Sequence, residues 1–412
     1  MTEPNVPPAM AHEETDLSPS ATEDMATQTP PNSKNPAKGS RVELSQWLDE
    51  KFDWSWFTAT QSTGGFAIAL AECPKQFHGL QTIGTIVFVA NLIVFLSFNA
   101  LMIIRFSTNP GRLRRSLTVA PECFFFGSYW LTIAGIIMCM QRYGAPHVGD
   151  WLLVVVRILF WTYAAVTFVS TSLHFVVVFE YTTVSAIDMS PAWFFLIFNS
   201  MLTGTVAANI APAQPPDQRW PIIIAGVAYQ GLGWLVSMLI LSWFFGRMME
   251  KGWPEPSMTP SLFITIGTAG YTIVALIGLA QAIPNNHGYF EKHPMAPEIL
   301  RIVATWTGIF MWLFNFWLFS IAFLITVAGS IRRQEGRWVF PMSFNNGWWA
   351  MIFPNVGFTL GTIYIGEELE SNAIKWVGVG MILVLAVFWM MDVFLMCRVM
   401  ARAVFQKSRV GP

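Results

Sequence analysis

The stretch DMSPAWFFLIFNSMLTGTVAANIAP, residues 188–212, joins two different compositions in one candidate helix. Its first half is as apolar as a membrane span must be. Its second half carries Asn199, Thr203, Thr205 and Asn209 at positions where leucine would bury more apolar surface. A helix that only has to remain in lipid gains nothing from these polar groups, so we expect them to face something other than lipid.

The whole chain has the composition of an integral membrane protein. It has 412 residues, of which 54% are hydrophobic and only 12% charged, whereas soluble domains carry about 25% charged residues. The net charge of -1 gives no indication of a nucleic-acid partner. The four cysteines lack the CxxC or CxxH spacing of a zinc site. We therefore expect neither a metal nor a cofactor.

The two ends of the chain differ from the rest. Residues 1–52 are rich in Pro, Ser, Thr, Glu and Lys and poor in large apolar side chains. Such a segment cannot bury enough surface to offset the entropy lost on ordering, which predicts a disordered N-terminal tail. We therefore divide the chain into this cytoplasmic tail, a membrane domain at 53–400 and a cytoplasmic C-terminal tail at 401–412.

Apolar runs recur through the membrane domain. A helix needs about 20 apolar residues to cross the hydrocarbon core of a bilayer. Short connections between the runs predict antiparallel neighbours, and therefore five consecutive helical hairpins. The ten candidate spans lie near residues 55–72, 80–104, 119–141, 150–178, 190–211, 220–246, 260–282, 298–328, 345–365 and 373–399.

Most of the 24 Lys and Arg residues flank the same ends of these spans as the two termini. By the positive-inside rule, both termini are expected in the cytoplasm. Arg157 falls inside a span, where a charge is a functional candidate by default, although its side chain could also reach outward to the interface. His174 is the natural candidate for proton coupling, with an ordinary interfacial histidine as the alternative.

The ten spans are of two kinds. The even-numbered spans are strongly apolar, whereas odd-numbered spans carry small and hydroxyl residues in their middles, as in TATQSTGG (58–65) and TIGTAGYT (265–272). Small residues commonly allow membrane helices to pack closely. The alternative is that the odd spans form an inner ring around a pathway and the even spans face lipid. Prolines at or inside odd spans, such as Pro191 and Pro354, favour the inner ring.

Four motifs in order carry a resemblance to a known family. They are WFTATQSTGGFAIAL, DMSPAWFFLIFNSMLTGT, PSMTPSLFITIGTAGYT and NNGWWAMIFPNVGF, and together they extend over about residues 54–400. The chain resembles the tellurite-resistance/dicarboxylate transporter family, which also includes the slow anion channels, and within it the fungal malic acid transporter branch. The sequence departs from the family at Gln61-Ser62-Thr63-Gly64, where many relatives have MGTG, and near Phe198-Asn199, where many have proline.

The resemblance implies a fold and a gate. It implies an all-α integral membrane protein with ten transmembrane helices, arranged as five hairpins in quasi-fivefold order around a central pore. The odd helices line that pore, and the assembly is commonly a homotrimer. In the channel members a phenylalanine on the ninth helix plugs the pore, and alignment of WWAMIFP with that helix places it at Phe353.

The resemblance also implies the cargo, a C4-dicarboxylate such as malate, succinate or fumarate carried across the plasma membrane. Hydroxyl and amide groups can replace water around such an anion without trapping it. Sulfite or other small-anion efflux is the alternative within the family, and a non-transporting receptor or scaffold is the alternative outside it. No motif indicates an enzyme. The candidate substrate and pore residues are Gln61, Thr63, Gly64, Thr203, Gly204, Thr205, Gly267, Thr268, Asn355, Thr359 and Arg157.

Overall fold

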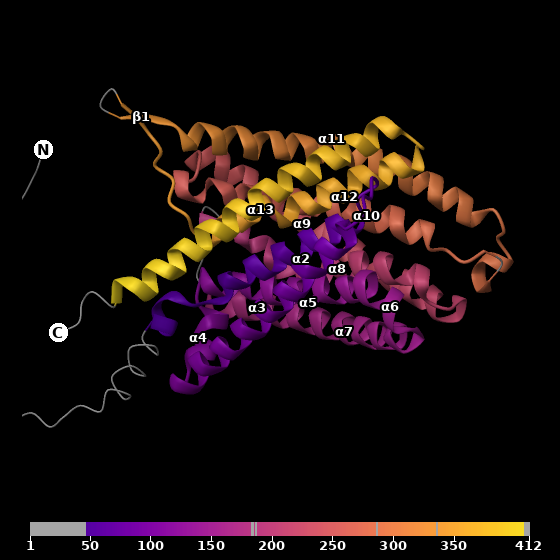
Figure 1. Ribbon diagram of the computed structural model, residues 1–412, viewed down its shortest axis with the longest axis horizontal. Helices are drawn as coiled ribbons and strands as arrows, with labels where there is room; N and C mark the ends of the chain where they lie inside the picture. The colour runs from indigo at the N-terminus through magenta and orange to yellow at the C-terminus, as the bar shows by residue number, and fades with distance from the viewer. Residues whose placement is uncertain (1–46, 183–184, 186–187, 286, 335–336, 408–412) are drawn as a thin grey trace, which may run out of the picture. The chain divides into compact units, whose positions relative to one another are not determined.

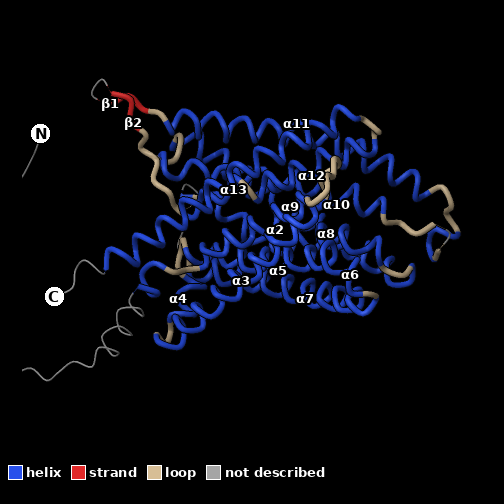
Figure 2. The backbone as a smooth tube through the Cα atoms, in the orientation of Figure 1, coloured by secondary structure: helices blue, strands red, loops and turns tan. Residues whose placement is uncertain are grey.

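The computed structural model describes residues 47–182, 185, 188–285, 287–334 and 337–407, without the side chains of 332–334 and 403–407. Residues 1–46 of the predicted disordered tail (1–52) and the last five residues lie outside this range. The described part of that tail differs from the prediction, because residues 47–51 are helical and Leu48 and Phe52 are buried. As predicted, the described chain is built almost entirely from helices (Figure 1). The exception is an antiparallel ribbon of β1 (Arg332–Gln334) and β2 (Arg337–Val339), drawn in red in Figure 2.

Within the described residues, eight helical segments are long and apolar enough to cross a membrane. The two other predicted spans correspond to α2 (Phe57–Ala71) and α12 (Phe353–Glu368), which have 15 and 16 residues. At 1.5 Å per residue, a helix of this length is only about 24 Å long. Each is preceded by a 3-10 segment, η1 (Trp54–Trp56) or η9 (Asn346–Met351), which lengthens it.

The helices fall into two groups by burial. In one group, only 22% to 33% of each helix's most apolar stretch is buried inside the protein. We call these the outer helices: α3 (Leu80–Thr108), α7 (Asp150–Tyr181), α9 (Pro216–Lys251), α11 (Ala296–Ser330) and α13 (Asn372–Lys407). The inner helices are α2, α5 (Phe126–Cys139), α8 (Phe195–Ile210), α10 (Ile266–Gln281) and α12. The segments containing α5, α8 and α10 are 61%, 100% and 94% buried, so the division between odd and even spans is present in the fold.

The inner helices contact one another in a closed sequence. Helix α2 packs on α5, α5 on α8, α8 on α10 and α10 on α12, and α12 returns to α2. Each outer helix covers an inner one, with α3 on α2, α9 on α8, α11 on α10 and α13 on α12, while α7 lies mainly on α8. In Figure 1, α2 and α8 accordingly lie between α11 and α7.

Every inner helix begins with a 3-10 segment. The remaining three such segments are η2 (Glu122–Phe125), η5 (Pro191–Phe194) and η7 (Pro256–Thr265). Proline at or before these segments, as at Pro121 and Pro191, removes a backbone donor and favours a tight first turn. The short connecting segments are α4 (Arg112–Thr118), η3 (Met140–Gly144), α6 (Ala145–Val148), η6 (Ala211–Ala213) and η8 (Gly288–Glu291).

One contact recurs between inner and outer helices. In three hairpins a buried amide of the outer helix lies against a glycine of the inner helix, where an added Cβ would come within 2.5 to 3.2 Å of the amide group. The three pairs are Gly64–Asn91, Gly204–Gln230 and Gly270–Asn315. Glycine is therefore required there for close packing, which is the common use of small residues between membrane helices.

Candidate functional site

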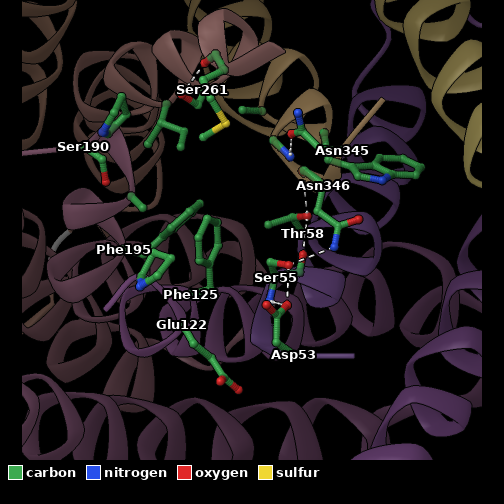
Figure 3. Close-up of a pocket in the computed structure, with 18 of the residues that line it drawn as sticks. Asp53, Ser55, Thr58, Glu122, Phe125, Ser190, Phe195, Ser261, Asn345 and Asn346 are labelled. Atoms are coloured by element: carbon green, nitrogen blue, oxygen red, sulfur yellow. Dashed lines mark hydrogen bonds between the residues drawn. The ribbon is translucent and has the colours of Figure 1, made fainter. Parts of the chain in front are cut away.

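A cavity of about 420 Å³ opens at the N-terminal ends of the inner helices (Figure 3). All five contribute to its wall through their first turns and 3-10 segments. We call it the N-terminal cavity. Phe125 and Phe195 form an apolar part of the wall, with ring centroids 5.6 Å apart. The uncharged polar residues that line it are Ser55, Thr58, Gln61, Ser62, Ser190, Ser261, Asn345 and Asn346.

Hydrogen bonds fix one side of this cavity. Asn346 Nδ2 donates to Ser55 Oγ at 2.8 Å, and Thr58 Oγ1 donates to the Asn346 carbonyl at 3.2 Å. Asn345 Oδ1 caps η9 by accepting from the Gly347 amide at 2.8 Å. These bonds, visible in Figure 3, join η9 to the start of α2. The two bonds of Asn346 therefore hold the first and last inner helices together at this wall.

The N-terminal cavity is not a basic patch. Its charged lining residues are Glu50, Asp53, Glu122 and Lys51. Asp53 caps the first turn of η1, and Glu122 pairs with the buried Arg105 at 2.6 Å. An anion in this cavity would be attracted by Lys51, by amide groups and by the inner-helix N-termini, each of which carries about half a positive charge.

A second space lies further along the same helices. Its volume of about 10 Å³ is close to the roughly 10–15 Å³ that one water molecule requires. We call it the C-terminal space. All five inner helices contribute, and apart from Phe353 the contributing residues are closer to the helix C-termini than those lining the first cavity. The lining residues are Gly65, Ile68, Glu72, Met138, Thr205, Asn209, Tyr271, Val274, Phe353, Val356, Leu360 and Tyr364.

Phe353 lies at the boundary of the two spaces. It lines the C-terminal space, whereas the next residue, Pro354, lines the N-terminal cavity. Its ring centroid is 4.9 Å from that of Tyr271, whose hydroxyl donates to the Phe353 carbonyl at 2.9 Å. On the opposite side, a Cβ added at Gly65 would lie 3.0 Å from Phe353 Cδ2. The ring therefore lies between α2 and α10.

Three of the predicted site residues line these spaces. Gln61 lines the N-terminal cavity, and its buried Oε1 has no hydrogen-bond partner among the described residues. Thr205 and Phe353 line the C-terminal space. The predicted residues outside both linings are Thr63, Gly64, Thr203, Gly204, Gly267, Thr268, Asn355, Thr359 and Arg157.

Several of these nine residues point toward outer helices. Thr63 Oγ1 accepts a hydrogen bond from Trp389 Nε1 of α13 at 3.1 Å. Asn355 and Thr359 line an apolar pocket between α11 and α13. Arg157 donates to Gln214 Oε1 at 3.3 Å in a separate pocket.

The other five are buried in the helical body. Gly64 and Gly204 lie against the outer amides described above. The Oγ1 of Thr268 donates to the Thr265 carbonyl at 2.8 Å, and an added Cβ at Gly267 would lie 3.3 Å from the Phe198 ring. Thr203 is fully buried. The candidate His174 on α7 is buried beside Phe126 and lines neither space.

Other lining residues were not among the predicted set. Asn209 belongs to the polar half of the 188–212 stretch, but its position at the end of the span gave it the appearance of a helix terminus. Glu72 and Tyr364 also lie at span ends, where charged and aromatic residues are ordinary interfacial anchors. Asn345 and Asn346 precede their helix and enter the cavity only through η9.

The sequence signature of the voltage-dependent anion channel family matches residues 51–397, which include every inner helix. The chain belongs to the voltage-dependent anion channel family. The match confirms the family resemblance seen in the four sequence motifs.

Relatives within this family bear transport names. A malic acid transport protein of Schizosaccharomyces pombe is 32% identical over 361 residues, 88% of this chain and 81% of that protein. A sulfite efflux pump of Arthroderma otae is 28% identical over 348 residues, 82% of this chain and 88% of the pump. An uncharacterized transporter of Methanocaldococcus jannaschii is 21% identical over 347 residues, 82% of this chain and 92% of its own length. These similarities support anion transport by a multi-pass membrane protein.

Proposed function

We propose that this protein carries C4-dicarboxylate anions such as malate across the plasma membrane, along the axis enclosed by its inner helices. One observation carries the proposal. Five buried helices meet in a closed sequence, with a cavity at their N-terminal ends that polar and aromatic side chains line together, and with the Phe353 ring beside Tyr271 beyond it. A set of helices that only packed together would not need a cavity into which serine, threonine and amide groups project.

The N-terminal cavity suits a small anion. Its volume of about 420 Å³ is within the roughly 300–1,000 Å³ range of small-molecule sites. Helix N-termini and amides such as that of Gln61 attract an anion with modest strength, which allows rapid release from this cavity. The carboxylates of Asp53 and Glu122 are engaged in a cap and an ion pair, which limits their repulsion.

Malate is favoured over sulfite by sequence similarity. The relative named for malic acid transport has higher identity than the sulfite pump, 32% against 28%, and matches more of this chain. Sulfite efflux is the second candidate because the same cavity would accept a smaller anion. The two functions require the same fold and differ only in the cargo.

The finer architecture is part of the proposal. All ten helices cross the membrane as five hairpins in quasi-fivefold order, with Phe353 as the gate and with Gln61 and Thr205 on the pathway. Both termini are cytoplasmic, so the N-terminal cavity opens to the cytoplasm. Exposed apolar residues on the outer helices, such as Phe310 and Leu235, contact lipid and the neighbouring subunits of a homotrimer.

The test is reconstitution of the full chain into liposomes. Uptake of labelled malate, succinate, sulfite and chloride would be compared with and without a pH gradient. We expect malate and succinate uptake to exceed that in protein-free liposomes, with sulfite slower. Sulfite flux without dicarboxylate flux would replace the first candidate by the second. Absence of every anion flux from correctly inserted protein would refute both. The mass of the protein in detergent would test the homotrimer.

A further inference from the structure

An acid–base pair stands at the far end of the central axis. Glu72 directly follows α2 and lines the C-terminal space. Its carboxylate contacts the Arg142 guanidinium through Oε1 and Nη2. The Glu72 side chain is only 14% exposed, whereas that of Arg142 is 35% exposed. The pair therefore joins the closed space to the outside of the molecule on the side opposite the N-terminal cavity.

The backbone that holds Arg142 is unusual. Arg142 lies in η3 (Met140–Gly144), a π-helical segment that interrupts the helix between α5 and α6. Such segments are rare, and they occur frequently at functional sites because the widened turn redirects a side chain. The neighbouring Tyr143 hydroxyl donates to the Ala67 carbonyl of α2 at 2.5 Å. An irregular turn, anchored to α2, thus places a guanidinium at the end of the axis.

We propose that Arg142 binds a carboxylate of the transported anion, and that Glu72 occupies Arg142 when no anion is present. The proposal rests on the proposed function and specifies its chemistry. A planar guanidinium matches a carboxylate through two parallel N–H···O bonds, better than it matches a spherical anion. The Glu72 side chain ends in the same group as malate, so one carboxylate replaces another and the half-buried guanidinium keeps a partner throughout.

The surroundings of the pair fit this exchange. Arg142 Nε is buried without a hydrogen-bond partner among the described residues, so the guanidinium retains an unused donor. Between Phe353 and the pair, the C-terminal space presents the Tyr364 side chain and the Asn209 amide, whose buried Oδ1 also lacks a described partner. An anion that passes Phe353 would meet these polar groups before it reaches Arg142.

The competing explanation is a structural clamp between α2 and η3. A clamp would affect the stability of the fold but not the discrimination between anions. Binding of substrate by Arg142 would change the KM for malate and the preference for carboxylates, even where the protein folds normally. The two explanations therefore differ in measurable quantities.

The experiment measures concentration-dependent malate uptake in liposomes that contain Glu72→Gln, Arg142→Gln or Arg142→Lys. For Glu72→Gln we expect the KM for malate to fall roughly tenfold, as expected when a charged competitor for one guanidinium is removed. For Arg142→Gln we expect a rise in KM and loss of the preference for malate over chloride. Arg142→Lys keeps the charge but loses the planar fork, so its preference should be intermediate.

A matched control is available at the same end of the molecule. Glu368 pairs with Arg301 at 2.8 Å, and neither residue lines the two axial spaces. Glu368→Gln removes one carboxylate from an ion pair, as Glu72→Gln does, and should leave the KM for malate unchanged. Thermal stability of each purified variant would show whether the protein is folded.

The outcomes separate this proposal from the proposed function. If the wild-type protein carries malate and the Glu72 and Arg142 variants match its KM and its preference, the pair is a clamp and the proposal is wrong. If the wild-type protein carries sulfite but no dicarboxylate, the carboxylate exchange is refuted together with malate transport. A lower KM in Glu72→Gln with an unchanged KM in Glu368→Gln would support the exchange.

Discussion

The two spaces on the central axis are lined by the same five helices, yet one is open and the other closed. The N-terminal cavity measures about 420 Å³ and the C-terminal space about 10 Å³. Serine, threonine and asparagine line the first, where the helices begin with 3-10 turns. Large side chains such as Phe353, Tyr271 and Leu360 fill the second. The same five helices therefore leave room between them at one level, whereas side chains fill the space between them at the other.

Removal of the Phe353 ring should join the C-terminal space to the N-terminal cavity. Of the substitutions that test the two spaces, it should have the largest effect on anion flux. In Phe353→Ala the N-terminal cavity would extend toward the C-terminal space. We expect anion flux to increase roughly tenfold or more, equivalent to at least 1.4 kcal/mol off the barrier. The measurement is the initial rate of malate efflux from liposomes per inserted protein.

The matched control is Phe358→Ala, five residues further along the same helix. Phe358 is also buried, but it lines the apolar pocket beside α11 rather than the axis. Truncation of a buried phenylalanine costs about 3–5 kcal/mol of stability at either position. Only the change at Phe353 should increase flux, and equal rates in the two variants would remove Phe353 from the role of gate.

A methyl group at Gly65 should keep the C-terminal space closed and leave the N-terminal cavity open. The new Cβ would lie 3.0 Å from Phe353 Cδ2, which is too close unless the ring moves. After a shift of a few tenths of an ångström the ring would rest against the new methyl group, so we expect Gly65→Ala to hinder movement of the ring and to reduce malate flux several-fold. The adjacent Gly64 faces Asn91 and α5 instead, so Gly64→Ala meets a similar contact of 3.1 Å away from the axis. If both variants reduce flux equally, the effect comes from packing and not from the gate.

The division into inner and outer helices could be predicted from the sequence because it depends on composition alone. A helix enclosed by protein on all sides needs small residues for close approach, whereas a helix that faces lipid can be apolar throughout. Helix α8, within the 188–212 stretch, is buried along its whole length. The recurring amide–glycine contact was not visible, because a single Asn91 or Gln230 in a long apolar helix gives no sequence repeat.

The direction of each polar side chain could not be predicted from the sequence. A helix buried on every side has no hydrophobic face that would identify the opposite, functional one. Thr205 of α8 lines the C-terminal space, but Asn199 accepts a hydrogen bond from Thr171 of α7 at 2.7 Å. Similarly, Gln61 lines the N-terminal cavity while Thr63, two residues later, bonds to α13. Only the arrangement of the helices in space shows which polar side chains line the two spaces and which bond to outer helices.

A change at Gln61 tests the N-terminal cavity. Its effect on malate transport should be smaller than that of changes at Phe353 or Gly65. In Gln61→Leu the amide that faces the N-terminal cavity is lost. Because one hydrogen bond contributes about 0.5–1.5 kcal/mol, we expect the KM for malate to rise about two- to tenfold. Thr63→Val is the control, since Thr63 lines neither axial space. A KM in Gln61→Leu equal to that of Thr63→Val would place the anion elsewhere in the cavity.

Substitution of Arg157 should have the smallest effect on malate transport, because Arg157 lies outside both spaces. Its guanidinium is near Gln214 in a pocket that also contains Arg219, between α7 and the start of α9. Arg157→Gln would remove one hydrogen bond of 3.3 Å from a partly exposed site, which affects stability by about 1 kcal/mol or less. We expect KM and maximal rate for malate to remain at wild-type values. A rise in KM as large as that of Gln61→Leu would mean that anions also bind outside the ring of inner helices, and that the axis is not the only site of recognition.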